Sequence, residues 1–410
     1  MRRQCAPSAH RAVMVGPSLR AVKRHATLIY PEPADLTVYR AGPIIWLTNA
    51  HSLCAYRTAG WGQEPMKAAV LTSLGHPLEV RDCPKPRPGP REVLVRTVAC
   101  GICATDLHIA DGWAYTPRLP HILGHEPAGV VEEAGQGASR FHPGDRVVPN
   151  IFLNCGTCPS CRRGHATVCQ RMGGIIGVLT PGAFAEYFTV PETNLFHLPD
   201  AIPFGEGAVI ADAVVTAVRA VLRRSSLRAG EWALVYGVGG VGQSVLQIAR
   251  GIGAHAVAVD IDDEALSVAR ALGAEAAVNA QSAEVVLSVR EALGHDLPCA
   301  AFDCVGTAAS VHTSLALLAP GGELVIVGYT DETFTLSPRQ LAQNELLVCG
   351  SRSGTVDDTR DAIRLVASGT VRPHISATVP LQDINAGFDL LRSGRARGRV
   401  VVTIGEANSV

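Results

Sequence analysis

Four cysteines lie close together in the first half of the chain, at a spacing that suits a metal ion. Cys155, Cys158, Cys161 and Cys169 fall within one 15-residue stretch. Four thiolates in a short loop can surround Zn²⁺ as a tetrahedron and leave no coordination position open, which is typical of a structural site. Two disulfides or free thiols are the alternative, but clustered cysteines in a chain this long are more typical of metal binding in a reducing compartment. The pattern therefore predicts a structural zinc site in a cytoplasmic protein.

A second set of residues that could bind a metal and move a proton lies upstream of the cysteine loop. Cys103 and His125 could ligate a catalytic zinc ion, and Asp106 could orient the imidazole of His125 by a hydrogen bond. The hydroxyl of Thr105 could accept a proton from an alcohol, and His108 could carry that proton toward solvent. Each of these residues alone is more often a core or surface residue. The hypothesis of a catalytic zinc site depends on the set.

A glycine-rich turn follows a short apolar run and precedes a helical pattern. The turn reads Gly237-Val238-Gly239-Gly240-Val241-Gly242 and fits the dinucleotide-binding pattern G-x-G-x-x-G. Such glycines let the backbone approach a pyrophosphate at the start of a helix, where free N–H groups favour an anion. Asp260, 18 residues after Gly242, could accept hydrogen bonds from a ribose 2′-hydroxyl and repel a 2′-phosphate. The residues that follow Asp260 add three acidic groups and no arginine that could receive a phosphate. The sequence therefore predicts NAD rather than NADP.

The segments around these motifs differ in their secondary-structure pattern. Short strand-like runs separated by Gly and Pro extend from Met66 to about Val190 and predict a partly open β-barrel. From about residue 213, strands alternate with helices, which predicts βαβ units and a parallel sheet. We expect strands at 232–236, 256–260, 300–303 and 323–327, and helices at 241–251, 262–273 and 358–368. Late strand-like segments that end with 399–403 could return to the first domain.

Composition excludes several classes of protein. Hydrophobic residues make up 47% of the 410-residue chain and charged residues 18%, which disfavours a disordered protein. A formal net charge of -1 argues against nucleic acid, including the zinc-ribbon mode of binding, and against an anionic membrane surface. Because no apolar run approaches about 20 residues, we expect no membrane span.

The first residues of the chain carry no motif that we can interpret as chemistry. Residues 1–31 contain six basic residues and no acidic one, so a mitochondrial transit peptide is one reading and an extension without a folded role is the other. We expect residues 1–65 to form a non-core extension and the fold to begin at Met66.

From Met66 to its end, the chain resembles the zinc-containing medium-chain alcohol dehydrogenase family. The resemblance rests on the Cys103-to-His108 run, Gly124-His125-Glu126, Gly144-Asp-Arg-Val147, the four-cysteine loop and the Gly237-to-Gly242 turn. It implies an α/β protein in which a chaperonin-10-like β domain holds both zinc ions and a doubly wound Rossmann domain holds the coenzyme. The implied boundaries are 66–212 for the catalytic domain, 213–351 for the coenzyme domain and 352–410 for a return to the catalytic domain.

The resemblance also implies site residues that spacing alone does not reveal. Asp212 occupies the position of the third catalytic zinc ligand, where many relatives have cysteine, and Glu126 is the alternative ligand. Thr216 occupies the position of a residue that touches nicotinamide. Arg399 matches an arginine that binds the coenzyme pyrophosphate, although a solvated basic cluster with Arg395 and Arg397 would also explain it.

Taken together, the motifs predict a zinc- and NAD-dependent dehydrogenase of small primary or secondary alcohols. A polyol, sugar or amino-alcohol dehydrogenase of the same superfamily is the runner-up. Zinc-free enoyl reductases lack both cysteine sets, and a zinc-storage protein would not need Thr105 and His108. Trp113 could narrow the substrate pocket or simply pack. We further expect two zinc ions per chain, a small alcohol, aldehyde or ketone as partner, and assembly as a homodimer or homotetramer.

Overall fold

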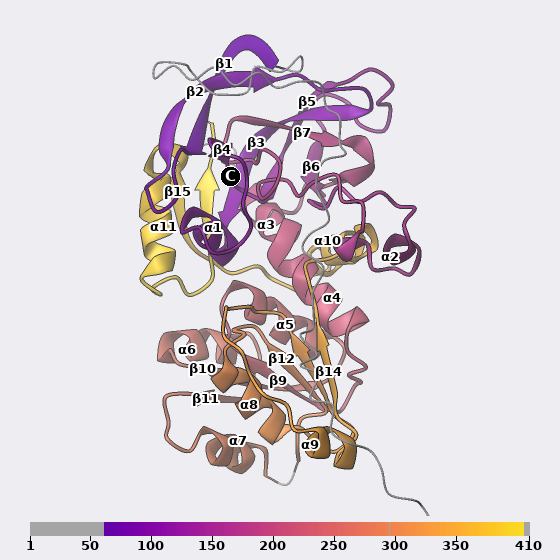
Figure 1. Ribbon diagram of the computed structural model, residues 1–410, viewed down its shortest axis with the longest axis vertical. Helices are drawn as coiled ribbons and strands as arrows, with labels where there is room; N and C mark the ends of the chain where they lie inside the picture. The colour runs from indigo at the N-terminus through magenta and orange to yellow at the C-terminus, as the bar shows by residue number, and fades with distance from the viewer. Residues whose placement is uncertain (1–60, 295, 406–410) are drawn as a thin grey trace, which may run out of the picture. The chain divides into compact units, whose positions relative to one another are not determined.

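The computed structural model describes residues 61–294 and 296–405, and residues 1–60 of the predicted extension (1–65) lie outside that range. Two structural regions follow one another along the chain, the first built of strands that pair mostly antiparallel and the second of alternating strands and helices (Figure 1). This confirms the expected α/β class. Within the described residues, no helix combines the length and the apolar character that a membrane span needs.

The first region contains two sheets. The larger sheet has the order β15 (Ile375–Pro380), β16 (Arg399–Thr403), β3 (Glu92–Ile102), β5 (Glu126–Ala134), β6 (Arg146–Pro149) and β8 (Leu195–His197), and β7 (Tyr187–Pro191) also pairs with β3. The smaller sheet consists of β2 (Glu79–Pro86), β1 (Trp61–Leu71) and β4 (His121–Ile122). The insertion of β15 and β16 beside β3 confirms that the late strands return to the first region.

The strand that we expected to begin the fold at Met66 begins earlier, at Trp61. Trp61 and Pro65 pair with Pro86 and Pro84 of β2, and the register shifts between them. The run at Lys67–Leu71 therefore continues a longer strand. The prolines and the irregular register obscured the first part of β1 in the sequence, because proline is depleted in regular strands.

The second region is a six-stranded, entirely parallel sheet. Its order is β11 (Ala276–Asn279), β10 (His255–Asp260), β9 (Trp232–Tyr236), β12 (Ala300–Asp303), β13 (Glu323–Ile326) and β14 (Leu347–Gly350). In chain order the strands run 3-2-1-4-5-6, the order of a Rossmann sheet, whose switch point lies between β9 and β12. The glycine turn follows β9 and therefore lies where such sheets bind their ligands.

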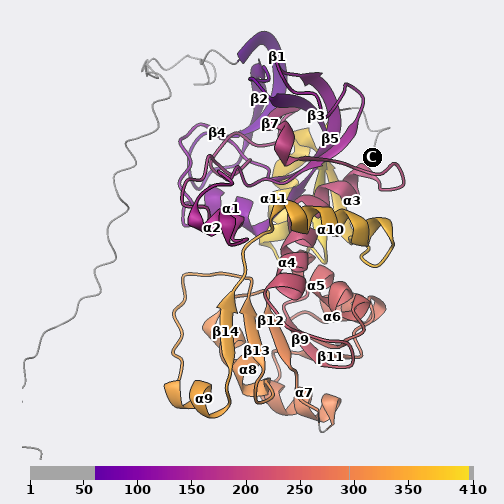
Figure 2. The same cartoon turned by 90° about the vertical axis from the view of Figure 1, so that its right-hand side faces the viewer.

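Alternate residues of the central strand face two different cores. Ala233 and Val235 pack in the core that also contains buried residues of α4 (Val215–Arg223), α5 (Gly240–Gly251) and α6 (Asp263–Ala271). Leu234 and Tyr236 face the opposite core, which includes residues of α7 (Val285–Leu293) and α8 (Ala308–Leu317). This twofold alternation is what a strand covered by helices on both faces requires. Figure 2 shows the strands of this sheet with their flanking helices from the side.

The remaining helices connect or cover these sheets. They are α1 (Ala104–Ala110), α2 (Pro159–Arg162), α3 (Phe204–Val209), α9 (Pro338–Gln343), α10 (Val356–Ala367) and α11 (Ile384–Arg392), and a π-helical turn, η3 (Ile210–Val214), joins α3 to α4. The helical segment that leads into the parallel sheet thus begins at Phe204, earlier than the predicted change near residue 213. Gly205 and Gly207 lower helix propensity there. A Cβ at Gly207 would lie 2.6 Å from Leu198, so packing requires this glycine and overrides propensity.

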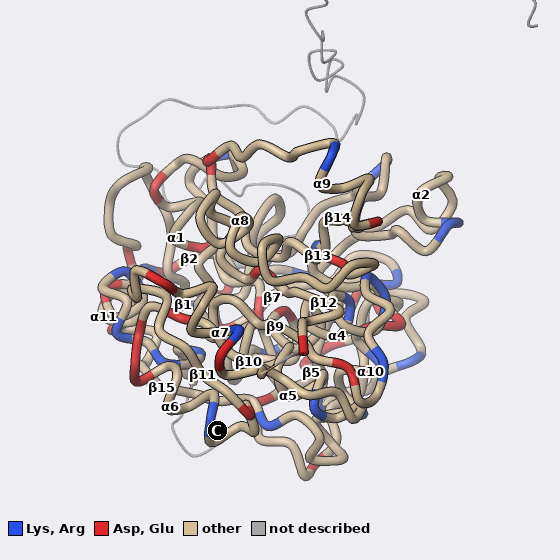
Figure 3. Tube along the Cα trace, turned by 90° about the horizontal axis from the view of Figure 1, so that it is seen from below, with Lys and Arg blue, Asp and Glu red and all other residues tan. Residues whose placement is uncertain are grey.

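Charges of both signs are interspersed along the described part of the chain. Figure 3 shows basic and acidic residues alternating around the trace without a large region of one sign. This distribution agrees with the formal net charge of -1.

Candidate active site

Three strands of the larger sheet bring distant residues to one point. β3 ends at Ile102, and β5 and β16 run antiparallel to it, so that Gly101 pairs with Glu126 and Ile102 pairs with Val400. Cys103 follows the end of β3, whereas Glu126 and Arg399 begin β5 and β16. The end of one strand and the beginnings of its two neighbours therefore coincide.

Helix α1 fixes the position of Cys103 and Asp106. Cys103 is the N-cap residue, and its backbone N–H donates to Asp106 Oδ2 at 2.9 Å. The other oxygen, Oδ1, lies 3.1 Å from Nδ1 of His125. Asp106 is fully buried, so its carboxylate holds both the helix start and the imidazole ring. Nε2 of His125 faces Asp212 on the other side.

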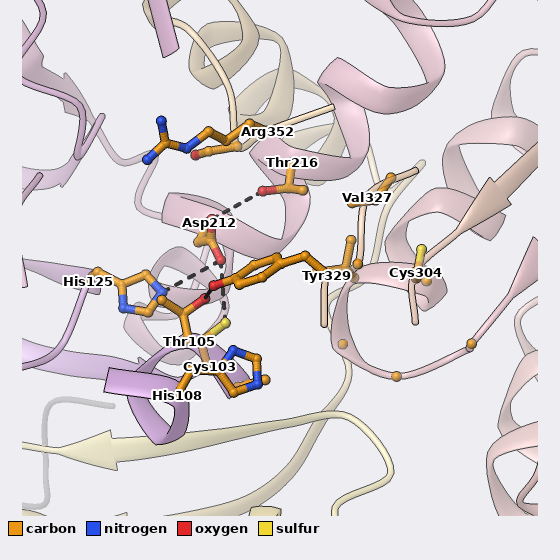
Figure 4. Close-up of a pocket in the computed structure, with 18 of the residues that line it drawn as sticks. Cys103, Thr105, His108, His125, Asp212, Thr216, Cys304, Val327, Tyr329 and Arg352 are labelled. Atoms are coloured by element: carbon orange, nitrogen blue, oxygen red, sulfur yellow. Dashed lines mark hydrogen bonds and ion pairs between the residues drawn. The ribbon is translucent and has the colours of Figure 1, made fainter. Parts of the chain in front are cut away.

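Asp212 reaches this point from the π-helical turn η3. Its Oδ2 lies 3.7 Å from Sγ of Cys103 and 3.8 Å from Nε2 of His125, while Oδ1 accepts a hydrogen bond of 3.1 Å from Thr216. Single π-helical turns are rare and frequently occur at functional sites, because the extra residue redirects a side chain. Here the turn directs Asp212 toward the end of β3 (Figure 4).

The donor atoms fit a four-coordinate metal ion. Ligand atoms of Cys103, His125, Glu126 and Asp212 all lie within 4.8 Å of one another. Ligand bonds of about 2.0–2.3 Å in a tetrahedron place neighbouring ligand atoms roughly 3.4–3.8 Å apart, which matches the separations of Asp212 from Cys103 and His125. One thiolate and one carboxylate also neutralise the charge of Zn²⁺. The residues present therefore suit zinc.

Glu126 differs from the other three because an arginine binds both of its carboxylate oxygens, although the same guanidinium also lies 3.5 Å from Oδ2 of Asp212 and 3.7 Å from Sγ of Cys103. Arg399 donates from Nε to Oε2 at 3.0 Å and from Nη2 to Oε1 at 2.5 Å. Arg399 is only 6% exposed, which excludes the solvated basic cluster as its environment. With both carboxylate oxygens engaged by a bidentate guanidinium, Glu126 is less available for a metal than Asp212.

Burial and neighbouring charges shift the pKa values of this set. Burial raises the pKa of Glu126 to about 7, although the Arg399 charge opposes the shift. Burial alone would also raise the pKa of Asp212, but the hydrogen bond and charge of His125, with Arg399, hold it below its usual range. Burial alone would lower the pKa of His125, whereas Asp106 raises it. Asp212 is therefore the better anionic ligand of the two carboxylates.

The residues of the predicted proton path lie beside this donor set, but they do not form a continuous chain. Oγ1 of Thr105 lies 3.0 Å from the hydroxyl of Tyr329 (Figure 4). The ring of His108 lies 3.9 Å from that of Trp113, and its Nδ1 is buried without a hydrogen-bond partner among the described residues. Burial lowers the pKa of His108, which keeps the imidazole neutral. Trp113 packs on His108, but Trp113 is not among the described residues that line the cavity.

The glycine turn between β9 and α5 has the geometry that a bound pyrophosphate requires. Gly237 has a φ of +83°, which favours glycine, and a Cβ at Gly242 would lie 1.9 Å from the carbonyl oxygen of Gly237. A Cβ at Gly240 would lie 2.8 Å from Nη1 of Arg399. Arg399 therefore lies between the metal-donor set and the start of α5.

Asp260 ends β10 beside this turn. Its Oδ2 accepts a hydrogen bond of 2.7 Å from the Val238 backbone, and Oδ1 accepts one of 3.1 Å from the Asp262 backbone. One arginine does lie nearby, contrary to the impression from the local sequence. Nη2 of Arg397 lies 2.6 Å from Asp262, and its Nε lies 3.2 Å from Glu264. This arginine is already neutralised by two carboxylates.

The four-cysteine loop has sulfur separations that suit zinc and exclude disulfides. Sγ of Cys158 lies 3.4 Å from that of Cys161 and 3.8 Å from that of Cys169, and Cys155 and Cys169 are 3.4 Å apart. A disulfide needs about 2.05 Å, whereas the edges of a tetrahedron with Zn–S bonds of about 2.3 Å measure roughly 3.8 Å. The backbone N–H of Thr157 is the largest of the influences that lower the pKa of Cys155 to about 5, which favours the thiolate that binds metal.

One cavity of about 710 Å³ joins the metal-donor set to the glycine turn. A volume of this size is typical of ligand pockets. Its wall contains Cys103, Thr105, His108, His125, Asp212, Thr216, Gly237, Gly239, Gly240, Val241, Gly242, Asp260 and Arg399. The structure thus brings the predicted catalytic, metal and coenzyme residues to one space, except for the separate four-cysteine loop and the buried Asp106 and Glu126 behind the wall.

Comparison with known proteins identifies the family. Residues 89–200 match the family model described as an alcohol dehydrogenase GroES-like domain, and residues 240–368 match that of a zinc-binding dehydrogenase. An alcohol dehydrogenase of Geobacillus stearothermophilus is 36% identical over 341 residues, which cover 83% of this chain and 100% of that relative. The chain belongs to the zinc-containing alcohol dehydrogenase family.

Solved structures of this alcohol dehydrogenase family share the fold. A structure described as an NAD-dependent alcohol dehydrogenase has a TM-score of 0.79 and 33% identity, covering 83% of this chain and 100% of the other. A cobalt- and zinc-bound thermostable alcohol dehydrogenase from Pyrobaculum aerophilum has a TM-score of 0.76 and 31% identity, with the same coverage. Both the expected GroES-like region and the Rossmann region are thereby confirmed.

Some residues at the site were missed from the sequence of this family member. Tyr329 and Arg352 line the cavity, and Arg397 lies beside Asp262 and Glu264. Tyr329 and Arg352 follow β13 and β14, and the carboxyl ends of parallel strands are where such sheets bind ligands. That rule could have identified both, whereas no local signal marks Arg397.

Proposed function

We propose that this protein is a zinc- and NAD-dependent alcohol dehydrogenase that interconverts small primary or secondary alcohols with aldehydes or ketones. The single observation that carries the proposal is the cavity that joins the Cys103, His125 and Asp212 donor set to the glycine turn. Family membership and the NAD-dependent and zinc-bound relatives support it. Assembly as a homodimer or homotetramer and a cytoplasmic location remain predictions.

Separate groups of residues would hold the two zinc ions and the coenzyme in this proposal. When bound, zinc supplies a Lewis acid and NAD supplies a hydride acceptor. Cys103, His125 and Asp212 would hold the catalytic zinc, and Asp106 orients His125 through their 3.1 Å contact. The four thiolates of Cys155, Cys158, Cys161 and Cys169 would hold the structural zinc.

The cavity wall contains the residues that would hold the coenzyme. Thr216 lies next to Asp212 and would position the nicotinamide ring, the N–H groups at the start of α5 and Arg399 would hold the pyrophosphate, and Asp260 would bind the ribose. Arg399 also stays paired with Glu126, so it links the coenzyme subsite to the metal site.

Thr105 accepts the proton that leaves the alcohol, and His108 passes it toward solvent. No direct contact between Thr105 and His108 is present among the described residues, so an intervening hydroxyl or water must bridge them. The lowered pKa of His108 leaves Nδ1 or Nε2 free to accept that proton.

A substrate panel with metal analysis tests the proposal. We expect purified protein to contain two zinc ions per chain and to reduce NAD with at least one class of short primary or secondary alcohol, followed by the absorbance of reduced nicotinamide. Cys103→Ser should abolish activity, and Cys299→Ser, outside the cavity wall, is the matched control. A zinc-replete protein that oxidises no alcohol in the panel would refute the proposal.

A further inference from the structure

The tripeptide Ser351-Arg352-Ser353 forms part of the cavity wall and has no place in the proposed mechanism. It follows β14, which ends at Gly350 at the carboxyl edge of the parallel sheet. Figure 4 shows Arg352 on the opposite side of Asp212 from Thr105 and His108. These residues are therefore available to contact whatever occupies the cavity beside the metal-donor set.

Arg352 is a cation without an acidic neighbour. Nη1 donates to the carbonyl oxygen of Thr167 at 3.2 Å, Nη2 donates to the Tyr115 hydroxyl at 3.0 Å, and the guanidinium lies 5.1 Å from the Phe152 ring centre. Within residues 61–294 and 296–405, no carboxylate lies at ion-pair distance from it. A guanidinium has five N–H donors in a planar fork, so these two bonds leave donors for a further acceptor.

The side-chain hydroxyls of the two flanking serines also lack hydrogen-bond partners among the described residues. Oγ of Ser351 and Oγ of Ser353 are both buried, and neither has a hydrogen-bond partner among the described residues. Ser353 has a φ of +42°, a left-handed conformation that is strained for serine. Buried hydroxyls are normally paired, because leaving one unpaired is costly. Because both oxygens are buried beneath the cavity surface, the group of this tripeptide that can meet a bound molecule is the guanidinium of Arg352.

The position of Arg352 assigns this ligand to the substrate rather than to the coenzyme. Tyr115, Phe152 and Thr167, which contact the guanidinium, all precede the parallel sheet in the chain and belong to the strand-rich region. The coenzyme phosphates already have the start of α5 and Arg399, whose guanidinium lies next to Gly240. Apolar residues, among them Ile151, line the same cavity and strengthen a charge interaction there by lowering the local dielectric.

We propose that Arg352 binds an anionic oxygen group, carboxylate or phosphate, on the far end of the alcohol or carbonyl substrate. A carboxylate or phosphate accepts two parallel N–H bonds from a guanidinium. The inference rests on the proposed alcohol dehydrogenase activity and narrows its substrate class to hydroxy acids or phosphorylated alcohols.

The test compares matched substrates that differ only in the distal group. The panel contains ω-hydroxycarboxylates of increasing length, their neutral amides and ω-hydroxyalkyl phosphates, at saturating NAD. We expect kcat/KM for the best anionic compound to exceed that of its neutral counterpart by roughly 10- to 100-fold, as charge-assisted hydrogen bonds provide. Preference for carboxylate over phosphate, or the reverse, identifies which anion Arg352 takes.

Variants of the tripeptide separate binding from a structural role. Arg352→Met should abolish the preference through KM and leave kcat/KM for the neutral substrates within about twofold, and Arg352→Lys should retain part of it. Ser351→Ala should lose less of the anionic preference than Arg352→Met. Tyr115→Phe removes the hydrogen bond to the strand-rich region but keeps the guanidinium, so the preference should persist. Arg364→Met, an exposed arginine on α10, is the matched surface control.

A binding measurement removes the dependence on turnover. An alkanoate without a hydroxyl should bind the zinc- and NAD-loaded protein in calorimetry and should fail to bind Arg352→Met. Oxidation of neutral alcohols without any anionic preference, or an equal loss for both substrate classes in Arg352→Met and Tyr115→Phe, would overturn the inference and leave the proposed function intact. Failure to oxidise any member of either class would instead count against the proposed function.

Discussion

Coenzyme choice depends on the carboxylate of Asp260, and the structure lets its effect be estimated. Both oxygens accept backbone hydrogen bonds, at 2.7 Å from Val238 and 3.1 Å from Asp262, so the carboxylate is fixed and cannot turn away from a ligand. A ribose 2′-hydroxyl can donate to a remaining lone pair. A 2′-phosphate cannot donate in the same way and instead brings about -1.5 to -2 charges.

The repulsion that follows is large enough to measure. For a half-buried carboxylate and a phosphate about 4–5 Å away, with an effective dielectric constant of about 40–60, the cost is about 2–4 kcal/mol. That corresponds to roughly a 30- to 1,000-fold preference for NAD over NADP. Arg397 adds little attraction, because Asp262 and Glu264 already pair with it.

Two changes at Asp260 test the estimate. Asp260→Asn keeps the shape and removes the charge, so the ratio of kcat/KM for NAD to that for NADP should fall toward unity. Asp260→Ser should also raise the KM for NAD, since the ribose bonds are lost, without making NADP bind tightly. Adding Asp262→Asn and Glu264→Gln to Asp260→Ser should improve NADP use further by releasing Arg397.

Initial rates with both coenzymes at a fixed alcohol concentration provide the assay. Arg270→Gln, on α6 and directed to the Ala277 carbonyl, is a suitable control for a charge change near the end of β10. Equal use of NAD and NADP by the unmodified protein would refute the reasoning. An unchanged ratio in Asp260→Asn would show that another group sets the choice.

Three further predictions concern the metal sites and the proton path. Cys158→Ser should lower the midpoint of thermal unfolding and release one zinc ion, because it opens a closed structural site; full stability with lost activity would mean that the two sites have exchanged roles. Asp212→Ala should lose the other zinc ion and nearly all activity, while its circular dichroism spectrum stays unchanged. Retention of both metal and activity in this variant would assign the ligand role to Glu126. Thr105→Ala should reduce kcat by roughly 10²- to 10⁴-fold and His108→Ala by less, because water can replace the outer group; equal losses in the two variants would contradict this order.

The elements and motifs that depend on neighbouring residues were predictable from the sequence. The bounds of β9, β12 and β16 match the expected 232–236, 300–303 and 399–403, because each is a short apolar run with clear flanking turns. The four thiolates of the cysteine loop lie within 15 residues of one another, so their spacing was sufficient. Helix α6 spans Asp263–Ala271 rather than 262–273, since Asp262 caps the helix instead of joining it.

Features that depend on packing between distant segments were not predictable in this way. The π-helical turn around Asp212 has no periodic signal, and only the resemblance to a family directed attention to that residue. Tyr329 meets Thr105 across 224 positions, and Arg397 meets Asp262 across 135. Such pairs are set by how β13 and the segment before β16 are placed, which local propensity does not encode.

The central place of β16 in the first sheet has a consequence for the order in which the protein can fold during synthesis. The parallel sheet is contiguous, from Trp232 to Gly350, so all of its strands have been made before β16 emerges from the ribosome. β3, by contrast, can pair with β5 and β7 early, but its last residues, Ala99 to Ile102, lack their β16 partner until residues 399–403 are free to insert beside them. Domains generally fold as units as they are made, in order from the N-terminus, yet here the N-terminal sheet must be completed last. The catalytic site, which needs Arg399 next to Cys103, therefore forms only after nearly the whole chain has been released.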